Sequence, residues 1–590
     1  AKVHFIFFLS CHIITMGIAE FTAVNSRIRS FQQTVKLRNA KQVIKPIWCP
    51  TTKGTIPSWL NGGVLYRVGP GRFNLGDDGQ QYVIQHAFDG LSFVHRFEIS
   101  TEKQSIRYNS RHIAEGAERL LVENPEKNQI FFGHVPKVSP WRTFTNLLER
   151  LDKMAFRPRR ESFETPNDRN VGVTVTPNYP MPQSFTSTEG HVLVTKTDAN
   201  ALQQVHSESL EPTRIFDYTS YDERFQGPLS AAHHQRDPFT EETFNFTTTL
   251  GRTPTMTVFS LDKTNKNPKV LGKIIERKLP NGTTEPFTPT YIHAFWSTKN
   301  YVIVPESPLY YGKNGLDMVL QGSLAAALKW DPARPAYLHV VSRDPAVGHV
   351  VSLPVDPFFT FHSGNAWDTL DKDGNPVIEM DCCAFPNGDF LYQLHRFGHV
   401  DRNNKEDLAG GKIKPFKMNG INYTPGHLQF GDLNRYKLTW NKEKKTGEAS
   451  YRTITKNVEF PRFHPDYTYR SHKYLWGCQV QEASADDCER FSLVKVDLET
   501  GKTLTLNQKS HMFTEPVFVP RPGAEKEDDG ALLVFTNVLD PKNPEKDRCV
   551  FSIVDGQTME EIARSDIGEF PATTFHGSYV DSDFTSISIN

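Results

Sequence analysis

The chain has 590 residues, with 67 Lys and Arg against 68 Asp and Glu and a formal net charge of −1. This balance gives no electrostatic basis for binding nucleic acid or an anionic membrane. The length allows two to four ordinary domains, or one large all-β domain with extensions. Aromatic residues make up 12% of the chain, with 41 Phe, so a large core or an apolar cavity is feasible.

Residues 1–49 are interpreted as an N-terminal extension that is partly apolar. The stretch "VHFIFFLSCHIITMGIAEF" is apolar over about 17 residues, at the short limit for a membrane span. Residues 1–15 are interpreted as non-native or as upstream translation. The alternatives are a membrane anchor and a secretory signal, for which "AEF" is a poor cleavage site.

The chain from residue 50 to 590 is typical of a single all-β domain. Ten Asn-Gly or Asp-Gly pairs punctuate it, and these dipeptides supply the positive φ angles of tight hairpin turns. Between them lie short β-type runs such as "GVLYRV", "TMTVFSL" and "ALLVFTNVL". The pattern predicts a sandwich or a propeller, and a propeller accounts for the length. No sequence repeat gives the number of blades.

Two stretches break the β pattern. Residues 144–155 place a row of apolar side chains on one helical face, and residues 316–330 predict a second, more apolar helix. Both are interpreted either as helices that cap the domain or as a surface that dips into a membrane. The candidate membrane contacts are Phe144, Leu147, Leu148, Leu151 and Met154.

Three histidines stand among apolar residues, at His293 in "TYIHAFW", His362 in "FFTFHSG" and His576 in "TTFHGSYV". A buried imidazole is costly unless its nitrogens find partners. Each one taken alone reads as a satisfied core histidine. Acidic residues in other segments open a second interpretation, because carboxylates that hold histidines fix their tautomers in metal sites. These residues are Asp198, Glu459 and Glu515.

A fourth candidate lies in "SAAHHQRDP", where His233 and His234 are adjacent. Successive side chains of an extended strand point to opposite faces, so only one of the two can face a site inside the fold.

The other motifs of the sequence give weaker evidence of a function than these histidines do. "GPGRFNLG" lacks the strand and helix of a dinucleotide fold and is interpreted as a turn. The sequence contains no P-loop, no GxSxG and no HExxH. The adjacent Cys382 and Cys383 are interpreted as buried thiols. The seven cysteines are odd in number and form no CxxC pair, which favours reduced thiols in a cytosolic setting.

The chain resembles the carotenoid cleavage oxygenases, a family that includes apocarotenoid oxygenases and the retinoid isomerase of the eye. The resemblance runs from "IPSWLNGGVLYRVGPGRF" and "HAFDGLSFVHRF", through the four histidine segments and "EPVFVPRPGAEKEDDG", to "FHGSYV". It leaves out only about the first fifty residues. Strings such as "GPLSAAHHQRDP" and "FHSGNAWD" look most like the fungal branch.

The resemblance implies a seven-bladed β-propeller with a helical and loop cap over one Fe(II) per chain. Its four histidine ligands would be His233, His293, His362 and His576, with His234 at a position that the family usually fills with Pro. Asp198 would support His293, Glu459 would support His362, and Glu515 would support His576, whereas His233 usually lacks such a partner. Asp198 departs from the family, which more often has Glu there, and this shortens its reach.

The implied activity is cleavage of a C=C bond of a carotenoid or apocarotenoid by O2, giving two carbonyl products. The family needs no organic cofactor and no catalytic residue beyond the metal centre. Because the polyene is apolar, we expect a cytoplasmic protein in peripheral contact with membrane or lipid, with no nucleic acid partner. The alternatives are a stilbenoid-cleaving dioxygenase, a non-cleaving isomerase and a propeller that only binds a polyene.

Overall fold

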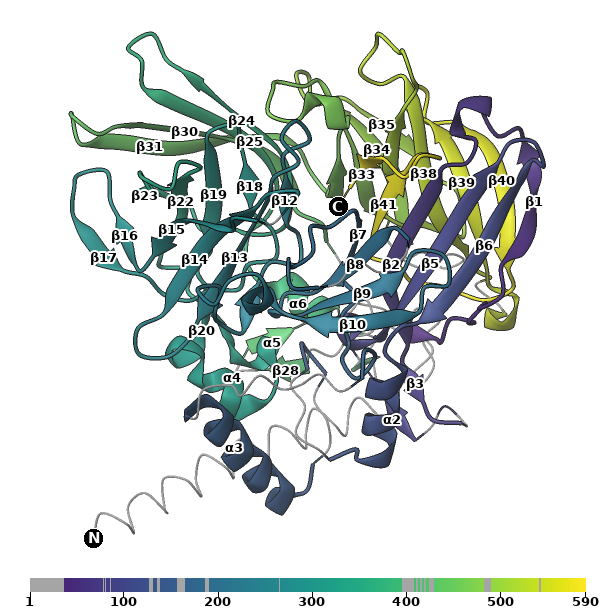
Figure 1. Ribbon diagram of the computed structural model, residues 1–590, viewed down its shortest axis with the longest axis horizontal. Coiled ribbons are helices and arrows are strands. Elements are labelled where there is room, and N and C mark those ends of the chain that lie inside the picture. Colours follow the sequence, from purple (N-terminus) through teal and green to yellow (C-terminus); the bar gives the residue numbers. More distant parts are fainter. Residues whose placement is uncertain are drawn as a thin grey trace.

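The computed structural model describes residues 37–589 apart from internal gaps, the longest of which are 156–164, 395–407, 424–428 and 482–489. Most of the regular structure in these residues is β-strand, and the few helices gather at one end of the molecule (Figure 1). The prediction of an all-β, propeller-like fold agrees with this arrangement.

Five separate sheets contain four or five antiparallel strands each. The first three are formed by β7 (Thr174–Pro177), β8 (Val192–Lys196), β9 (Leu202–His206) and β10 (Pro212–Phe216); by β11 (Leu229–Ser230), β12 (Gln235–Arg236), β13 (Thr243–Thr249), β14 (Thr255–Leu261) and β15 (Lys269–Ile274); and by β18 (Trp296–Ser297), β19 (Tyr301–Glu306), β22 (Ala336–Ser342) and β23 (His349–Val355). The other two are formed by β24 (Phe359–Leu370), β25 (Pro376–Phe385), β30 (Asp432–Asn441) and β31 (Thr446–Thr455), and by β32 (Glu459–Arg462), β33 (Tyr474–Gln481), β34 (Arg490–Asp497) and β35 (Thr503–Leu506).

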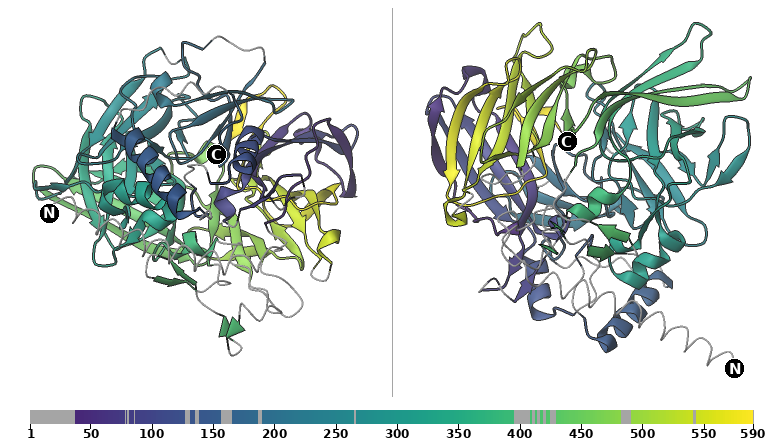
Figure 2. Two further views of the ribbon diagram at one scale, coloured as in Figure 1. Left: turned by 90° about the horizontal axis from the view of Figure 1, so that it is seen from below. Right: turned by 180° about the vertical axis from the view of Figure 1, so that it is seen from behind.

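A sixth, eleven-stranded sheet joins the two ends of the described chain. Its strands are β36 (His511–Phe513), β37 (Val517–Pro520), β38 (Gly530–Val538), β39 (Arg548–Asp555), β40 (Glu561–Gly568), β1 (Ile47–Gly54), β6 (Ser105–His112), β5 (Leu91–Ser100), β2 (Val64–Arg72), β41 (His576–Val580) and β42 (Ser586–Ser588). The late strand β41 pairs with the early strand β2, with Val68 opposite His576. The sheets stand around a centre near which the C-terminal end lies (Figure 2, left).

Separate hydrophobic clusters fill the spaces between neighbouring sheets. One of them brings Leu338 of β22 together with Ile378 of β25 and Leu438 of β30, all fully buried. Because each sheet buries apolar side chains against the next, the loops at the sheet ends are free to carry the polar residues of a site.

Several of the Asn-Gly and Asp-Gly pairs form turns between strands, as the sequence predicts. Asn281–Gly282 connects β16 (Glu276–Lys278) to β17 (Thr284–Pro286), and Asp373–Gly374 connects β24 to β25, with both glycines at positive φ. Asp89–Gly90 differs, because Gly90 has a φ of −54° and Asp89 ends a short 3-10 helix. Its buried carboxylate instead accepts backbone N–H groups of the loop at 132–134.

The predicted helix at 144–155 lies within α3 (Pro140–Ala155), at the same end of the molecule as α2 (Glu115–Glu123) (Figure 1). The prediction of one helix over 316–330 is wrong. That stretch forms α4 (Leu316–Gln321), α5 (Leu324–Ala327) and the strand β21 (Leu328–Trp330). Gly322 ends α4 in the left-handed conformation at φ +69°, and Ser323 caps α5, so the helix cannot continue.

Residues 1–36, with the predicted apolar stretch, lie outside the described residues. Residues 37–46 pack against the domain ahead of the predicted boundary, since Leu37 and Ala40 are buried. Among the described helices, none has the length and apolar character needed to cross a membrane.

Candidate metal centre

Four buried histidines converge at the centre of the fold. His233, His293, His362 and His576 each offer one ring nitrogen, and these atoms all lie within 4.8 Å of one another. The Nε2 atom of His576 is 3.1 Å from the Nε2 atoms of both His233 and His362. Two nitrogens bound at right angles to one metal ion, each about 2.1 Å from it, would be about 3.0 Å apart. The spacing therefore fits a metal ion.

Each histidine comes from a different part of the ring of sheets. His233 lies between β11 and β12, and His293 precedes β18. His362 lies in β24 where the pairing with β25 is irregular, and His576 is the first residue of β41. A β-bulge re-aims a side chain, which is how a residue inside a strand comes to face the centre.

Three carboxylates hold the outer nitrogens of three of these rings. The Nδ1 atom of His293 is 2.8 Å from Asp198 Oδ2, that of His362 is 2.5 Å from Glu459 Oε2, and that of His576 is 3.1 Å from Glu515 Oε1. A carboxylate accepts the Nδ1–H proton, which leaves the Nε2 lone pair free for a metal.

The surroundings of His233 and His576 favour the neutral form of both rings. Burial, followed by the neighbouring imidazoles, lowers the pKa of His233 and of His576 well below the usual value. Neutral imidazole is the form that binds metal.

Two buried arginines flank Glu515. Arg67 Nη1 is 3.8 Å and Arg462 Nη1 is 3.5 Å from the carboxylate. Burial lowers the pKa of Arg67 to about 10, and Glu515 opposes this effect. Neither arginine was predicted as a site residue, although Arg67 is a lone charge in the apolar run "GVLYRV".

The rings of the adjacent His233 and His234 point apart, although both residues lie in the bend between β11 and β12 and not in a strand as the alternation argument assumed. His233 faces the other three rings, whereas the ring of His234 packs edge-on against Tyr179, with centroids 5.2 Å apart. The Nδ1 atom of His234 is buried without a hydrogen-bond partner.

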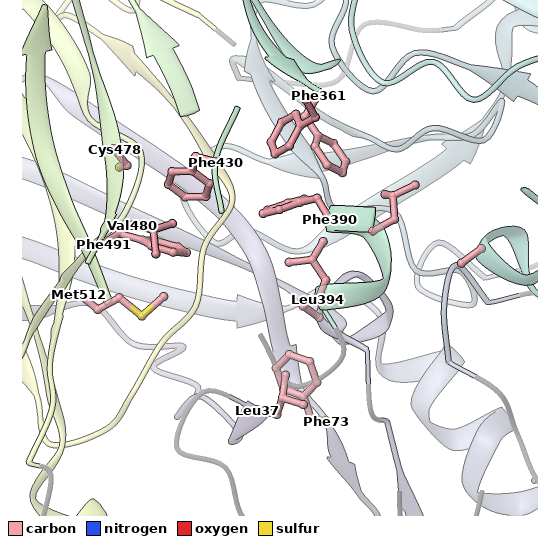
Figure 3. Packing of buried hydrophobic residues seen from close by; sticks show 14 of the residues in the cluster. Leu37, Phe73, Phe361, Phe390, Leu394, Phe430, Cys478, Val480, Phe491 and Met512 are labelled. Carbon is pink, nitrogen blue, oxygen red and sulfur yellow. The ribbon is translucent and has the colours of Figure 1, made fainter. Parts of the chain in front are cut away.

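A cavity of about 2160 Å³ reaches the histidine cluster and is lined by His293, His362 and His576. Pockets for small ligands usually measure about 300–1,000 Å³, so this one has room for a long molecule. Much of the wall is aromatic or aliphatic. Figure 3 shows Phe430, Phe491 and Met512 on one side of this space, facing Phe361, Phe390 and Leu394 on the other.

Aromatic rings also pack against the candidate ligands. Phe88 stacks near His293 and meets Phe132 edge-on, with the Phe88 and Phe132 centroids 5.0 Å apart. Asp89 fixes this wall, because its carboxylate holds the backbone N–H of Phe132.

Phe460 stacks on His362 at 5.1 Å between centroids. It adopts a φ of +57°, which is unusual for a bulky residue, and its N–H donates to Glu459 Oε2. The left-handed turn therefore positions the ring and the carboxylate together.

The candidate membrane contacts lie on α3. Phe144 and Leu148 are 40% and 49% exposed, and the neighbouring Trp141 is 74% exposed. Leu147 is half-buried, and Leu151 and Met154 lie in the part of α3 whose side chains are outside the described residues. The structure also buries Met318 and Val319 of α4, which line the cavity instead of facing outward.

A family model described as "Retinal pigment epithelial membrane protein" matches residues 37–581. The chain belongs to this family. The predicted resemblance to the carotenoid cleavage oxygenases is thereby confirmed, and with it the prediction of an oxygenase.

Several proteins that are similar to this chain are named as dioxygenases. The chain is 28% identical to a torulene dioxygenase of Fusarium fujikuroi, with 90% of each chain covered. It is 27% identical to a carotenoid dioxygenase of Neurospora crassa, with 90% of this chain and 88% of the other covered. It is 25% identical to the human mitochondrial carotenoid-cleaving dioxygenase, with 89% of this chain and 87% of the other covered. The fungal relatives agree with the predicted fungal resemblance.

Solved structures share the fold. The Glu150Asp mutant of Synechocystis apocarotenoid oxygenase superposes with a TM-score of 0.64 at 20% identity, over 93% of this chain and 98% of the other. A cobalt-substituted form of the same oxygenase gives a TM-score of 0.64 at 21% identity over the same shares.

We expect His233→Ala to lose bound metal, because it removes one of four converging nitrogens. His234→Ala should keep the metal content within a few-fold of the wild type, since its ring lies away from the cluster. Metal per chain, measured after purification, checks both variants, and His576→Ala serves as a positive control. A metal-free His234→Ala beside a metal-replete His233→Ala would contradict this assignment.

We expect Lys196 to make stability depend on pH. It is 1% exposed, its Nζ donates to Thr176 Oγ1 at 2.6 Å, and burial lowers its pKa to about 7. Below pH 7 the folded protein must bury a charged ammonium. Between pH 7 and about 10.4, the usual lysine pKa, only the unfolded chain binds the proton, so the free energy of unfolding rises with pH.

Lys196→Met lacks this contribution. It should therefore be more stable than the wild type at pH 6.5, and the difference should shrink by pH 9.5. Denaturant unfolding at both pH values measures the change, with the exposed Lys299→Met as control. If the difference in the free energy of unfolding between Lys196→Met and the wild type is the same at both pH values, Lys196 is not a neutral buried lysine.

Proposed function

We propose that the chain is a non-haem Fe(II) dioxygenase that cleaves one C=C bond of a carotenoid or apocarotenoid. Each carbon of that bond receives one oxygen atom of O2, which gives two carbonyl products. The observation that carries the proposal is the convergence of four buried imidazoles on the wall of a large aromatic cavity.

The donor set and the local charges favour a cation. Imidazole suits several transition metals, and the choice of iron rests on the resemblance to the family. Among the described residues, three carboxylates contact the histidine rings, and the two guanidinium groups of Arg67 and Arg462 lie beside one of them. A positive ion at the histidines would compensate the excess negative charge. Bound iron would supply the activation of O2.

The side chains of the protein would perform three tasks. Asp198, Glu459 and Glu515 hold the Nδ1 protons and so orient three of the four rings. The largely apolar wall of the cavity would exclude water. Phe88 and Phe460, which pack against candidate ligands, would keep a polyene beside the metal in a fixed orientation.

The size and character of the cavity support a long apolar substrate over a stilbenoid, which is shorter and carries phenol groups. A propeller that only binds a polyene would not require four convergent imidazoles. Isomerisation without cleavage would use the same cavity, so product analysis must separate the two reactions.

We infer seven blades in one domain. The sheet order gives five separate sheets, and β1 pairs with β40 on one side and with β6 on the other. If the eleven-stranded sheet is divided at β1, it counts as two blades. The predicted single domain over 50–590, extended to include residues 37–49, fits this count.

We also infer peripheral contact with a membrane through α3, in a cytoplasmic protein. Trp141, Phe144 and Leu148 are exposed, and α3 packs against α4, which lines the cavity. A polyene could then pass from lipid to the cavity without crossing water. The five cysteines of the described residues are unpaired, in keeping with a reducing compartment.

Aerobic incubation of iron-loaded protein with carotenoids, apocarotenals and a stilbenoid tests the reaction. We expect two carbonyl products from a carotenoid or apocarotenoid, each carrying label from ¹⁸O2 when exchange with water is controlled. Label in one product only would contradict a dioxygenase. Geometric isomers without cleavage would favour the isomerase, and exclusive stilbenoid cleavage would favour the alternative substrate.

Replacing both Trp141 and Leu148 with Ser should reduce binding to phosphatidylcholine vesicles while sparing turnover of detergent-solubilised substrate. The matched control is Phe239→Ser, since Phe239 is 68% exposed in the loop after β12. Vesicle co-sedimentation measures the binding. Equal binding by the double variant and the control would refute the contact through α3.

A further inference from the structure

The three carboxylates that support the histidine cluster differ in length and in partners. Glu459 and Glu515 hold His362 and His576, whereas His293 is held by the shorter Asp198. Asp198 has an additional partner, because the hydroxyl of Tyr291 donates to Asp198 Oδ2 at 2.7 Å. Glu459, by comparison, accepts from His362 and from the backbone N–H of Phe460.

Tyr291 is placed to act on His293 through the carboxylate. It lies two residues before His293 and is 2% exposed. Its oxygen is 3.3 Å from His293 Nδ1, but both groups donate to the same Asp198 oxygen. Two donors on one oxygen fix the direction of the carboxylate more firmly than one donor does.

The other oxygen of Asp198 reaches the segment that carries His233. Asp198 Oδ1 accepts the backbone N–H of Ala232 at 3.0 Å, and the Asp198 carbonyl accepts that of Ser230 at 2.9 Å. Ala232 directly precedes His233. In the described part of the chain, the ring of His233 makes no hydrogen bond to a carboxylate, so this backbone contact is its connection to Asp198.

We propose that Tyr291 is a positioning residue, which holds Asp198 so that one carboxylate places two of the four histidines. Asp198 orients His293 through its ring and His233 through the backbone before it. This inference rests on the proposed metal site. It adds a residue to that site and explains how a histidine without its own carboxylate is placed.

The test measures binding of Co²⁺ to metal-free protein by its visible absorption spectrum. Tyr291→Phe should weaken Co²⁺ binding by about 10-fold, at the low end of the usual cost of removing a group that orients a ligand. It should also change the ligand-field bands, because the geometry of His293 relaxes. The matched control is Tyr179→Phe, which removes a buried hydroxyl bonded to Tyr218 from a tyrosine that is also 2% exposed.

A double-mutant cycle separates action through Asp198 from a direct effect. We expect Tyr291→Phe combined with Asp198→Ala to bind Co²⁺ no more weakly than Asp198→Ala alone. Additive losses would overturn the proposal. So would Tyr291→Phe with the affinity and spectrum of the wild type, and in both cases the metal site itself would stand. Wild-type protein that binds no Co²⁺ would instead overturn the metal site and this inference together.

A measurement without metal tests the contact to the His233 segment. Hydrogen exchange of a peptide that covers residues 229–236 should be faster in Asp198→Ala and in Tyr291→Phe than in the wild type or Tyr179→Phe. The melting temperature of each metal-free variant shows whether the fold is retained. Unchanged exchange in both variants would overturn the backbone part of the proposal.

Discussion

The hydrogen bond from a histidine Nδ1 to a buried carboxylate is the interaction on which the centre of this protein depends. Without it, a neutral imidazole can carry its proton on either nitrogen. With it, the proton stays on the outside of the cluster and the lone pair faces inward. Three such bonds come from loops or strands of different sheets. They orient three of the converging rings so that the lone pairs face a common centre.

The three carboxylates differ in how far the surrounding groups compensate their negative charge. Glu515 is flanked by two guanidinium groups, which spread its negative charge, whereas Glu459 keeps one buried oxygen without a hydrogen-bond partner. Asp198 is engaged through both oxygens by groups that carry no net positive charge. His362 therefore faces the least compensated carboxylate and His576 the most compensated one, so the four nitrogens are not electronically equivalent.

Much of this site can be predicted from the sequence, because a histidine among phenylalanines or an acid in an apolar strand is a local signal. His293, His362 and His576 have that signature, whereas the choice of His233 and the pairing of the three carboxylates with the rings came from the resemblance to the family. Tyr291, Arg462 and Phe460 do not, since their roles depend on contacts between segments far apart in the chain. The helix expected over 316–330 fails at Gly322, where a single left-handed residue outweighs the apolar periodicity on both sides. The number of blades could not be predicted, because the sequence contains no repeat that marks one blade from the next.

The pairing of β2 with β41 sets the order in which the centre can be assembled. His576 opens β41 and is opposite Val68, about 500 residues earlier in the chain. During synthesis the first three histidines leave the ribosome before the fourth exists, and the fourth reaches the centre only when β41 takes its place beside β2. A growing chain therefore cannot hold a metal ion with four nitrogens, and the complete set of donors forms only when this pairing between distant parts of the chain is made.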